Sequence, residues 1–127
     1  PELEPHEVAL AALREMEGKE FDSRLFAFEV SEITRRYVEG RFGYQAMDKT
    51  GMEFLEVLHK LPLDTEHTDR MARLVRRWDM SKYAGTEFSD ERRQRDLDLV
   101  RDMVEMTRPV EGEGEEGGAE NESGEAI

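Results

Sequence analysis

The sequence predicts an all-α fold, a compact bundle of about five helices, and three observations support this prediction. Apolar residues recur at three- and four-residue spacing along most of the chain, which is the period of a helix that buries one face. Strict alternation of apolar and polar residues over the length of a strand is not found. Glycine, proline and short polar residues separate the periodic stretches, as expected where helices end and begin.

The first helix is expected to begin near Pro5 and to end at Gly18. Proline suits the first helical turn because the N–H that it lacks would have no partner there, and glycine commonly follows the last turn. The residues expected to be buried are Ala9, Ala12, Leu13 and Met16.

The second helix is expected from about Phe21 to Glu39. Its apolar stripe consists of Phe26, Val30, Ile33 and Tyr37, with Leu25 and Val38 at the edges. The segment Gly40-Arg41-Phe42-Gly43 then has the Gly-x-x-Gly pattern with which KH domains clamp a nucleic-acid backbone. Since no strand pattern flanks it, the favoured interpretation is a helix end, at which both glycines permit left-handed geometry and Phe42 folds back onto the core.

Capping residues predict the starts of the third and fourth helices. Thr50 and Glu53 have the spacing of a capping box. The third helix is expected to end at Pro62, because a proline disfavours helical geometry in the residue before it, and to bury Met52, Leu55, Leu58 and Leu61. Asp64 or Thr65 then caps a fourth helix, whose inward face is expected to be His67, Met71, Leu74, Val75 and Trp78.

Ser89 is followed by two acidic residues and predicts the start of a fifth helix, because negative side chains are favourable near the positive end of a helix dipole. The residues expected to be buried are Leu97, Val100, Met103 or Val104, and Thr107. Residues 110–127 are mostly glycine and glutamate, and they carry too little apolar surface to offset about 1–2 kcal/mol of backbone entropy per ordered residue. We therefore expect a helical domain over residues 1–109 and a disordered acidic tail over residues 110–127.

Composition argues against several functional classes. The 31 acidic residues outnumber the 18 Lys and Arg and give a formal net charge of -13, which disfavours generic nucleic-acid binding because phosphate neutralisation needs a basic face. Without cysteine there is no disulfide, thiolate metal ligand or thiol nucleophile. No apolar run in the chain is long enough to span a bilayer. The chain begins with Pro1 rather than methionine, which predicts a fragment of a longer protein.

The sequence contains no motif that indicates catalysis or a bound cofactor. His59 and His67 bracket Asp64, but a zinc site needs three or four ligands in fixed geometry, so metal binding is not expected. The serines lack the context of a nucleophile elbow, and no glycine-rich phosphate loop precedes a helix. We therefore expect no catalytic residue, cofactor or metal.

The candidate structural or interaction residues are Arg35, Arg36, Asp79, Lys82 and Tyr83. The two arginines form either a phosphate-binding pair or ordinary helical ion pairs with Glu32 and Glu39. A third hypothesis is that one of the arginines reaches Asp79 and forms a partly buried bidentate pair. Such a pair would fix the register of two helices rather than perform chemistry.

Two stretches of the chain resemble a bacterial protein family. They are FDSRLFAFEVSEITRRYVEGRFGYQAMDKTGMEFLEVL at 21–58 and RWDMSKYA at 77–84, and with PHEVALAAL at 5–13 they cover nearly all of residues 5–108. The family is the cytosolic helical region of single-pass membrane proteins of unknown function and of BatD-like aerotolerance proteins. Its members are typically encoded beside MoxR-type AAA+ ATPases and von Willebrand A-domain proteins. Gly51 departs from the family, which often has threonine or glutamate there.

The resemblance implies a location and a role. It places a membrane helix before Pro1 and this domain on the cytoplasmic face of the bacterial inner membrane. It also implies a non-catalytic protein-interaction domain that docks the MoxR-type ATPase or the von Willebrand A-domain partner. The alternative function is a helical domain that binds nucleic acid through Arg35, Arg36 and Arg41.

Overall fold

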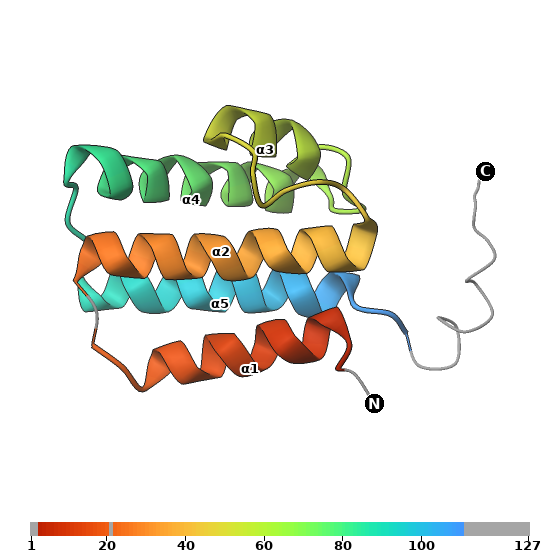
Figure 1. The fold of residues 1–127 in the computed structure, drawn as a ribbon, viewed down its shortest axis with the longest axis horizontal. Helices are drawn as coiled ribbons and strands as arrows, with labels where there is room; N and C mark the ends of the chain where they lie inside the picture. Colours follow the sequence, from red (N-terminus) through yellow and green to blue (C-terminus); the bar gives the residue numbers. More distant parts are fainter. Residues whose placement is uncertain (1–2, 21, 111–127) are drawn as a thin grey trace.

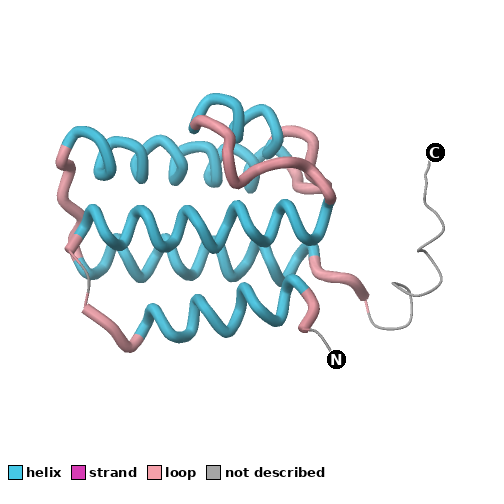
Figure 2. Tube along the Cα trace, viewed as in Figure 1, coloured by secondary structure: helices cyan, strands magenta, loops and turns pink. Residues whose placement is uncertain are grey.

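The computed structural model describes residues 3–20 and 22–110, which form five helices and no strand (Figures 1 and 2). The helices are α1 (Pro5–Glu17), α2 (Ser23–Phe42), α3 (Gly51–Leu58), α4 (Thr65–Ala84) and α5 (Asp90–Thr107). The prediction of an all-α bundle is confirmed. Of the acidic tail predicted over residues 110–127, all but Val110 lies outside the described residues.

Four long helices lie side by side as an antiparallel bundle, and each runs opposite to the long helix before it (Figure 1). α2 packs against α1, α4 and α5, and α5 also packs against α1 and α4. The short α3 interrupts the connection between α2 and α4 and packs on α4. The largest fully buried side chains are Trp78, Tyr37, Phe26 and Phe54. All five helices contribute buried residues to the same core, including Leu13 of α1 and Val100 of α5.

The predicted starts of α1, α3, α4 and α5 are confirmed at their capping residues. The start predicted for the second helix, Phe21, lies outside the described residues, and α2 begins at Ser23. Pro5 opens α1, and Thr50 and Glu53 form the expected capping box, with each side chain accepting a backbone N–H of the other residue. Asp64 accepts the N–H of His67 at the start of α4. Ser89 caps α5 in the same way. These contacts join residues three apart, so the local sequence determines them.

The end of α2 differs from the prediction. The helix continues through Gly40 to Phe42, and of the two glycines only Gly43 has left-handed geometry, with a φ of 82°. Gly40 has another role, because a Cβ there would lie 3.2 Å from Pro5 Cγ where α1 and α2 cross. Phe42 packs on the core beside Tyr37, as expected. A Gly-x-x-Gly loop of the KH type is thus excluded, since three of its four residues are helical.

The buried face of α3 was predicted only in part. Leu58 is buried as predicted, and so is Leu61 just after the helix, but Met52 is 80% exposed and Leu55 is only half-buried. Phe54 and Val57 are buried instead. Because α3 packs on α4 and not on the bundle centre, the contact with α4 selects the inward face of this short helix. The other residues expected to be buried that are instead half-buried or exposed are Ala12, Leu25, Ile33 and His67.

Within the part of the chain that the structure describes, no helix combines the length and the apolar character that a bilayer crossing requires.

Candidate functional site

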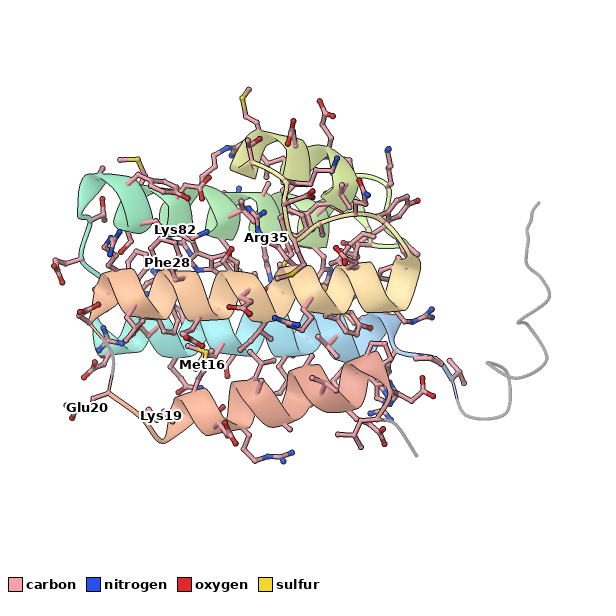
Figure 3. The ribbon with its side chains drawn as sticks, in the orientation of Figure 1. Met16, Lys19, Glu20, Phe28, Arg35 and Lys82 are labelled. Atoms are coloured by element: carbon pink, nitrogen blue, oxygen red, sulfur yellow. The ribbon has the colours of Figure 1, made fainter. Side chains whose placement is uncertain are left out.

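Four of the five candidate residues meet at one surface pocket. The pocket has a volume of about 310 Å³, lies between α2, α4 and the start of α3, and is lined by Arg35, Asp79, Lys82 and Tyr83 among others. We call it the α2–α4 pocket. Figure 3 shows Phe28, Arg35 and Lys82 in the space between the two helices. The fifth candidate, Arg36, lies outside this pocket.

Arg35 is 7% exposed, and its side chain is hydrogen-bonded to the connection between α2 and α3. Its Nη1 donates to the carbonyl oxygen of Ala46 at 3.1 Å and to that of Lys49, and its Nε donates to Ser31 Oγ at 3.2 Å. Its guanidinium carbon also lies 4.9 Å from the ring centroid of Phe54, a cation–π distance. Burial lowers the pKa of Arg35, and the nearby negative charge of Asp79 opposes that shift.

The hypothesis of a bidentate pair between an arginine and Asp79 was wrong. Arg35 is directed to the carbonyl oxygens of Ala46 and Lys49 in the loop after α2. Asp79 instead forms an ion pair with Lys82, with 3.8 Å between Oδ1 and Nζ. Its other oxygen occupies the space beside Gly51, where a Cβ would lie 1.9 Å from Oδ2. Any side chain at residue 51 must displace the carboxylate, which is a structural reason for the glycine at this position.

Lys82 is unusual for a lysine because only 8% of it is exposed. Its Nζ donates to Ser31 Oγ at 3.1 Å and lies 5.2 Å from the ring centroid of Phe28. Burial lowers the pKa of Lys82, and the positive charge of Arg35 lowers it further, against the attraction of Asp79. Two buried cations therefore share one pocket, and the positive charge there is incompletely offset.

Exposed apolar side chains line the pocket together with the two cations. Tyr83 is 74% exposed, and its ring packs edge-to-face on that of Phe28 with 6.3 Å between centroids. Phe28 and Met47 also line the pocket, and both are exposed. We call Phe28, Met47 and Tyr83 the apolar rim.

The sequence interpretation missed Phe28, Ser31 and Met47 as pocket residues. Phe28 and Ser31 were detectable, because with Arg35 they stand at three- and four-residue spacing and so share one face of a helix. Met47 was not detectable, because its position depends on the path of the loop after α2. Glu39 shapes this path by accepting the N–H groups of Ala46 and Met47, which lower its pKa.

The arginines of the nucleic-acid alternative do not form a common basic surface. Arg36 forms a surface ion pair with Glu32, as the helical-pair interpretation predicted, although Glu39 is bound to the loop and not to an arginine. Arg41 donates to the carbonyl oxygen of Thr107 at 2.8 Å and thereby satisfies the end of α5. With Arg35 buried, only Arg36 is freely accessible to a phosphate backbone.

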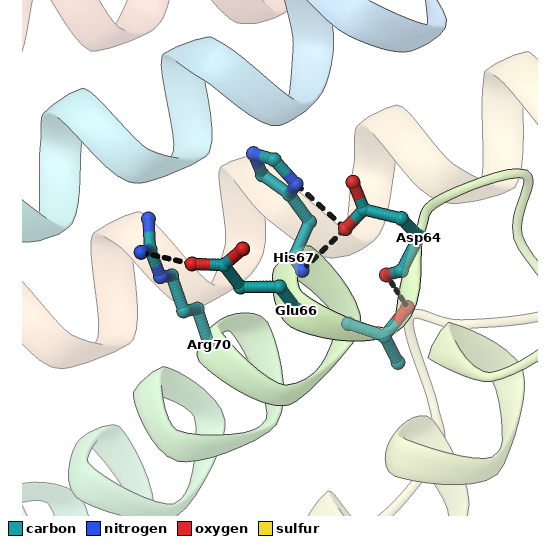
Figure 4. A network of polar contacts seen from close by, with 5 residues as sticks. Asp64, Glu66, His67 and Arg70 are labelled. Carbon is teal, nitrogen blue, oxygen red and sulfur yellow. Dashed lines mark hydrogen bonds and ion pairs between the residues drawn. The ribbon is translucent and has the colours of Figure 1, made fainter.

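Two of the three histidines, His59 and His67, have local hydrogen-bond partners. His67 and Asp64 are bound at the start of α4, where the carboxylate lies 2.8 Å from both the backbone nitrogen and Nδ1 of His67 (Figure 4). These hydrogen bonds lower the pKa of Asp64. His59 Nδ1 donates to the carbonyl oxygen of Leu55 at 2.8 Å. Among residues 3–20 and 22–110, no group of three or more His, Asp or Glu side chains is arranged to hold a metal ion.

A second, larger groove lies between α1 and α2. It has a volume of about 500 Å³ and is mainly apolar, with Val8, Ala12 and Ile33 on its walls and Arg36 at its edge. The half-burial of Ala12 and Ile33 follows from their position in this groove. We call it the α1–α2 groove.

The fold and the site define a helical bundle with one surface pocket that combines buried cations and an apolar rim. Comparison with protein-family models, with curated proteins and with solved structures finds no match. The resemblance to the BatD-like family thus stays a prediction from the sequence motifs.

Proposed function

We propose that this chain is a non-catalytic protein-interaction domain whose docking face is the α2–α4 pocket with its apolar rim. The observation that carries the proposal is that three exposed apolar side chains, those of Phe28, Met47 and Tyr83, line the same pocket as two buried cations. Single exposed apolar residues are common on any surface. Aromatic, methionine and arginine side chains are enriched together at protein interfaces, where they supply adaptable apolar contact and anchoring hydrogen bonds.

We further propose that the partner is a MoxR-type AAA+ ATPase or a von Willebrand A-domain protein. We also propose that a segment before Pro1 holds the domain at the cytoplasmic face of the bacterial inner membrane. Both proposals are supported by the sequence resemblance, and the docking face is supported independently by the pocket geometry. Failure of one partner to bind would therefore leave the docking face to be tested with the other.

Tyr83→Ala tests the docking face. We expect the variant to bind the ATPase or A-domain partner more weakly by about tenfold or more, because a large exposed ring at the edge of a pocket is a typical anchor. Its free energy of unfolding should fall by less than about 1 kcal/mol, because little beyond the contact with Phe28 is lost. Isothermal titration calorimetry and urea denaturation measure the two quantities.

Met106→Ala is the matched control, because Met106 is also an exposed apolar side chain but lies on α5. It should bind the partner as the unchanged chain does. Equal affinities of the Tyr83 variant and the unchanged chain would contradict the proposal. Oligonucleotide binding that is lost in Arg36→Ala and Arg41→Ala would favour the nucleic-acid alternative instead.

A further inference from the structure

We propose that the α2–α4 pocket binds one carboxylate group, an aspartate or glutamate side chain that an acidic segment of the partner protein inserts beside Lys82 and Arg35. This inference rests on the proposed function, since it states what the docking face recognises. It goes further by assigning the chemistry of the partner group and the two side chains that hold it.

The charges that line the pocket leave an excess of positive charge. Arg35, Lys49 and Lys82 are cationic, and Glu32 and Asp79 are anionic. Charges attract more strongly in a partly desolvated site than in water, and a buried cation without full compensation is costly. One added negative charge would balance the site.

Arg35 and Lys82 also keep hydrogen-bond donors for an incoming group. The bonds of Arg35 use Nε and Nη1, which leaves Nη2 without a partner among the described residues. Lys82 Nζ carries three N–H groups, one of which is donated to Ser31, and Asp79 lies beyond ordinary hydrogen-bond distance at 3.8 Å. Each carboxylate oxygen can accept hydrogen bonds from such donors, and these charge-assisted hydrogen bonds are stronger than those between neutral groups.

The same features favour a carboxylate over a phosphate. Two anionic side chains line the pocket, so a doubly charged group would be repelled more than a singly charged one. The apolar rim matches the side chains that flank an acidic residue in a protein segment. A nucleic acid is further disfavoured by the formal net charge of -13.

The probe for this inference is the α-amide of N-acetylglutamate, titrated into the full 127-residue chain and followed by amide NMR. We expect saturable shifts at Ser31, Lys49 and Gly51 with a dissociation constant in the millimolar range. The α-amide of N-acetylglutamine has the same shape without the charge and should give no saturable shift at these residues. Inorganic phosphate at equal ionic strength should bind more weakly than the glutamate compound.

Lys82→Met keeps the length and the apolar stem of the side chain and removes its charge. It should weaken glutamate binding by about tenfold while the rest of the spectrum stays dispersed. Lys82→Gln provides the same test if the methionine variant does not fold. Lys60→Met is the control, because Lys60 is exposed and lies at Tyr44, away from the pocket.

Four results would overturn the inference. Equal shifts with the glutamine compound would show that charge is not recognised, and tighter binding of phosphate would assign another ligand class. Shifts at the pocket when the seven glutamates after Pro109 are changed to glutamine, with no ligand present, would make the chain's own tail the occupant. Loss of partner binding in Tyr83→Ala without any glutamate binding would leave the proposed function standing and this inference refuted. Glutamate binding with no loss of partner binding in Tyr83→Ala would refute the proposed function alone.

Discussion

Asp96→Ala should lower the free energy of unfolding by about 3–5 kcal/mol, because it removes one member of a buried charged network. Asp96 is 1% exposed and joins α5 to α4. One carboxylate oxygen accepts from Arg77 Nη2 at 2.9 Å, and the other accepts from the indole Nε1 of Trp78 at 3.1 Å. Alanine would leave the indole N–H and the guanidinium without an acceptor between the two helices. Urea denaturation measures the loss.

Asp98→Ala is the control, because Asp98 pairs with Arg101 at the surface and the change should cost less than about 1 kcal/mol. Similar losses in the two variants would contradict the assignment of Asp96 as the buried member.

Burial raises the pKa of Asp96 against the attraction of Arg77 and the hydrogen bond from Trp78. The folded chain therefore binds this proton more tightly than the unfolded chain does. As the pH falls through the raised pKa towards the ordinary value, the unchanged chain should gain stability relative to Asp96→Asn.

Arg35→Ala should cost about 2–4 kcal/mol, because the charge-assisted hydrogen bonds to two loop carbonyl oxygens and the packing against Phe54 are lost. Amide hydrogen exchange should accelerate between residues 46 and 50, where those carbonyls hold the loop. Denaturation and exchange together measure the effect. A pure loss of surface charge would not produce local exchange.

The adjacent Arg36→Ala provides the control on the same helix. Its ion pair with Glu32 is solvent-exposed, so the expected cost is less than about 1 kcal/mol. If the two arginine variants were equally destabilised, the bracing role of Arg35 would be wrong. The sequence treats these neighbours alike, and their different burial follows from which face of α2 each occupies.

Local chemistry made most helix starts predictable. The caps at Thr50, Asp64 and Ser89 depend on contacts three residues apart, which the sequence shows directly. The inward face of α3 was harder to predict from the sequence, because a helix of eight residues has only about two turns and more than one apolar stripe fits it. Packing on α4 buries the stripe that includes Phe54, and Met52 is exposed to solvent.

The sequence predicted which residues form the site better than it predicted which groups those residues contact. Helical spacing brings Asp79, Lys82 and Tyr83 to one region of α4, and these residues do share a pocket with Arg35. The partner of Arg35 was missed because it is a pair of backbone carbonyls in an irregular loop. Asp96 was missed although a signal existed, since it stands four residues before Val100 on the buried stripe of α5.

Methionine-methyl NMR of the complex with the ATPase or A-domain partner tests the central claim most directly, because methionines lie at different places in the fold. Met47 belongs to the apolar rim, Met16 lines the α1–α2 groove, and Met106 is exposed on α5. We predict that the partner shifts or broadens the Met47 signal and leaves those of Met16 and Met106 in place. Perturbation of Met16 with an unchanged Met47 signal would place docking away from the α2–α4 pocket and contradict the account.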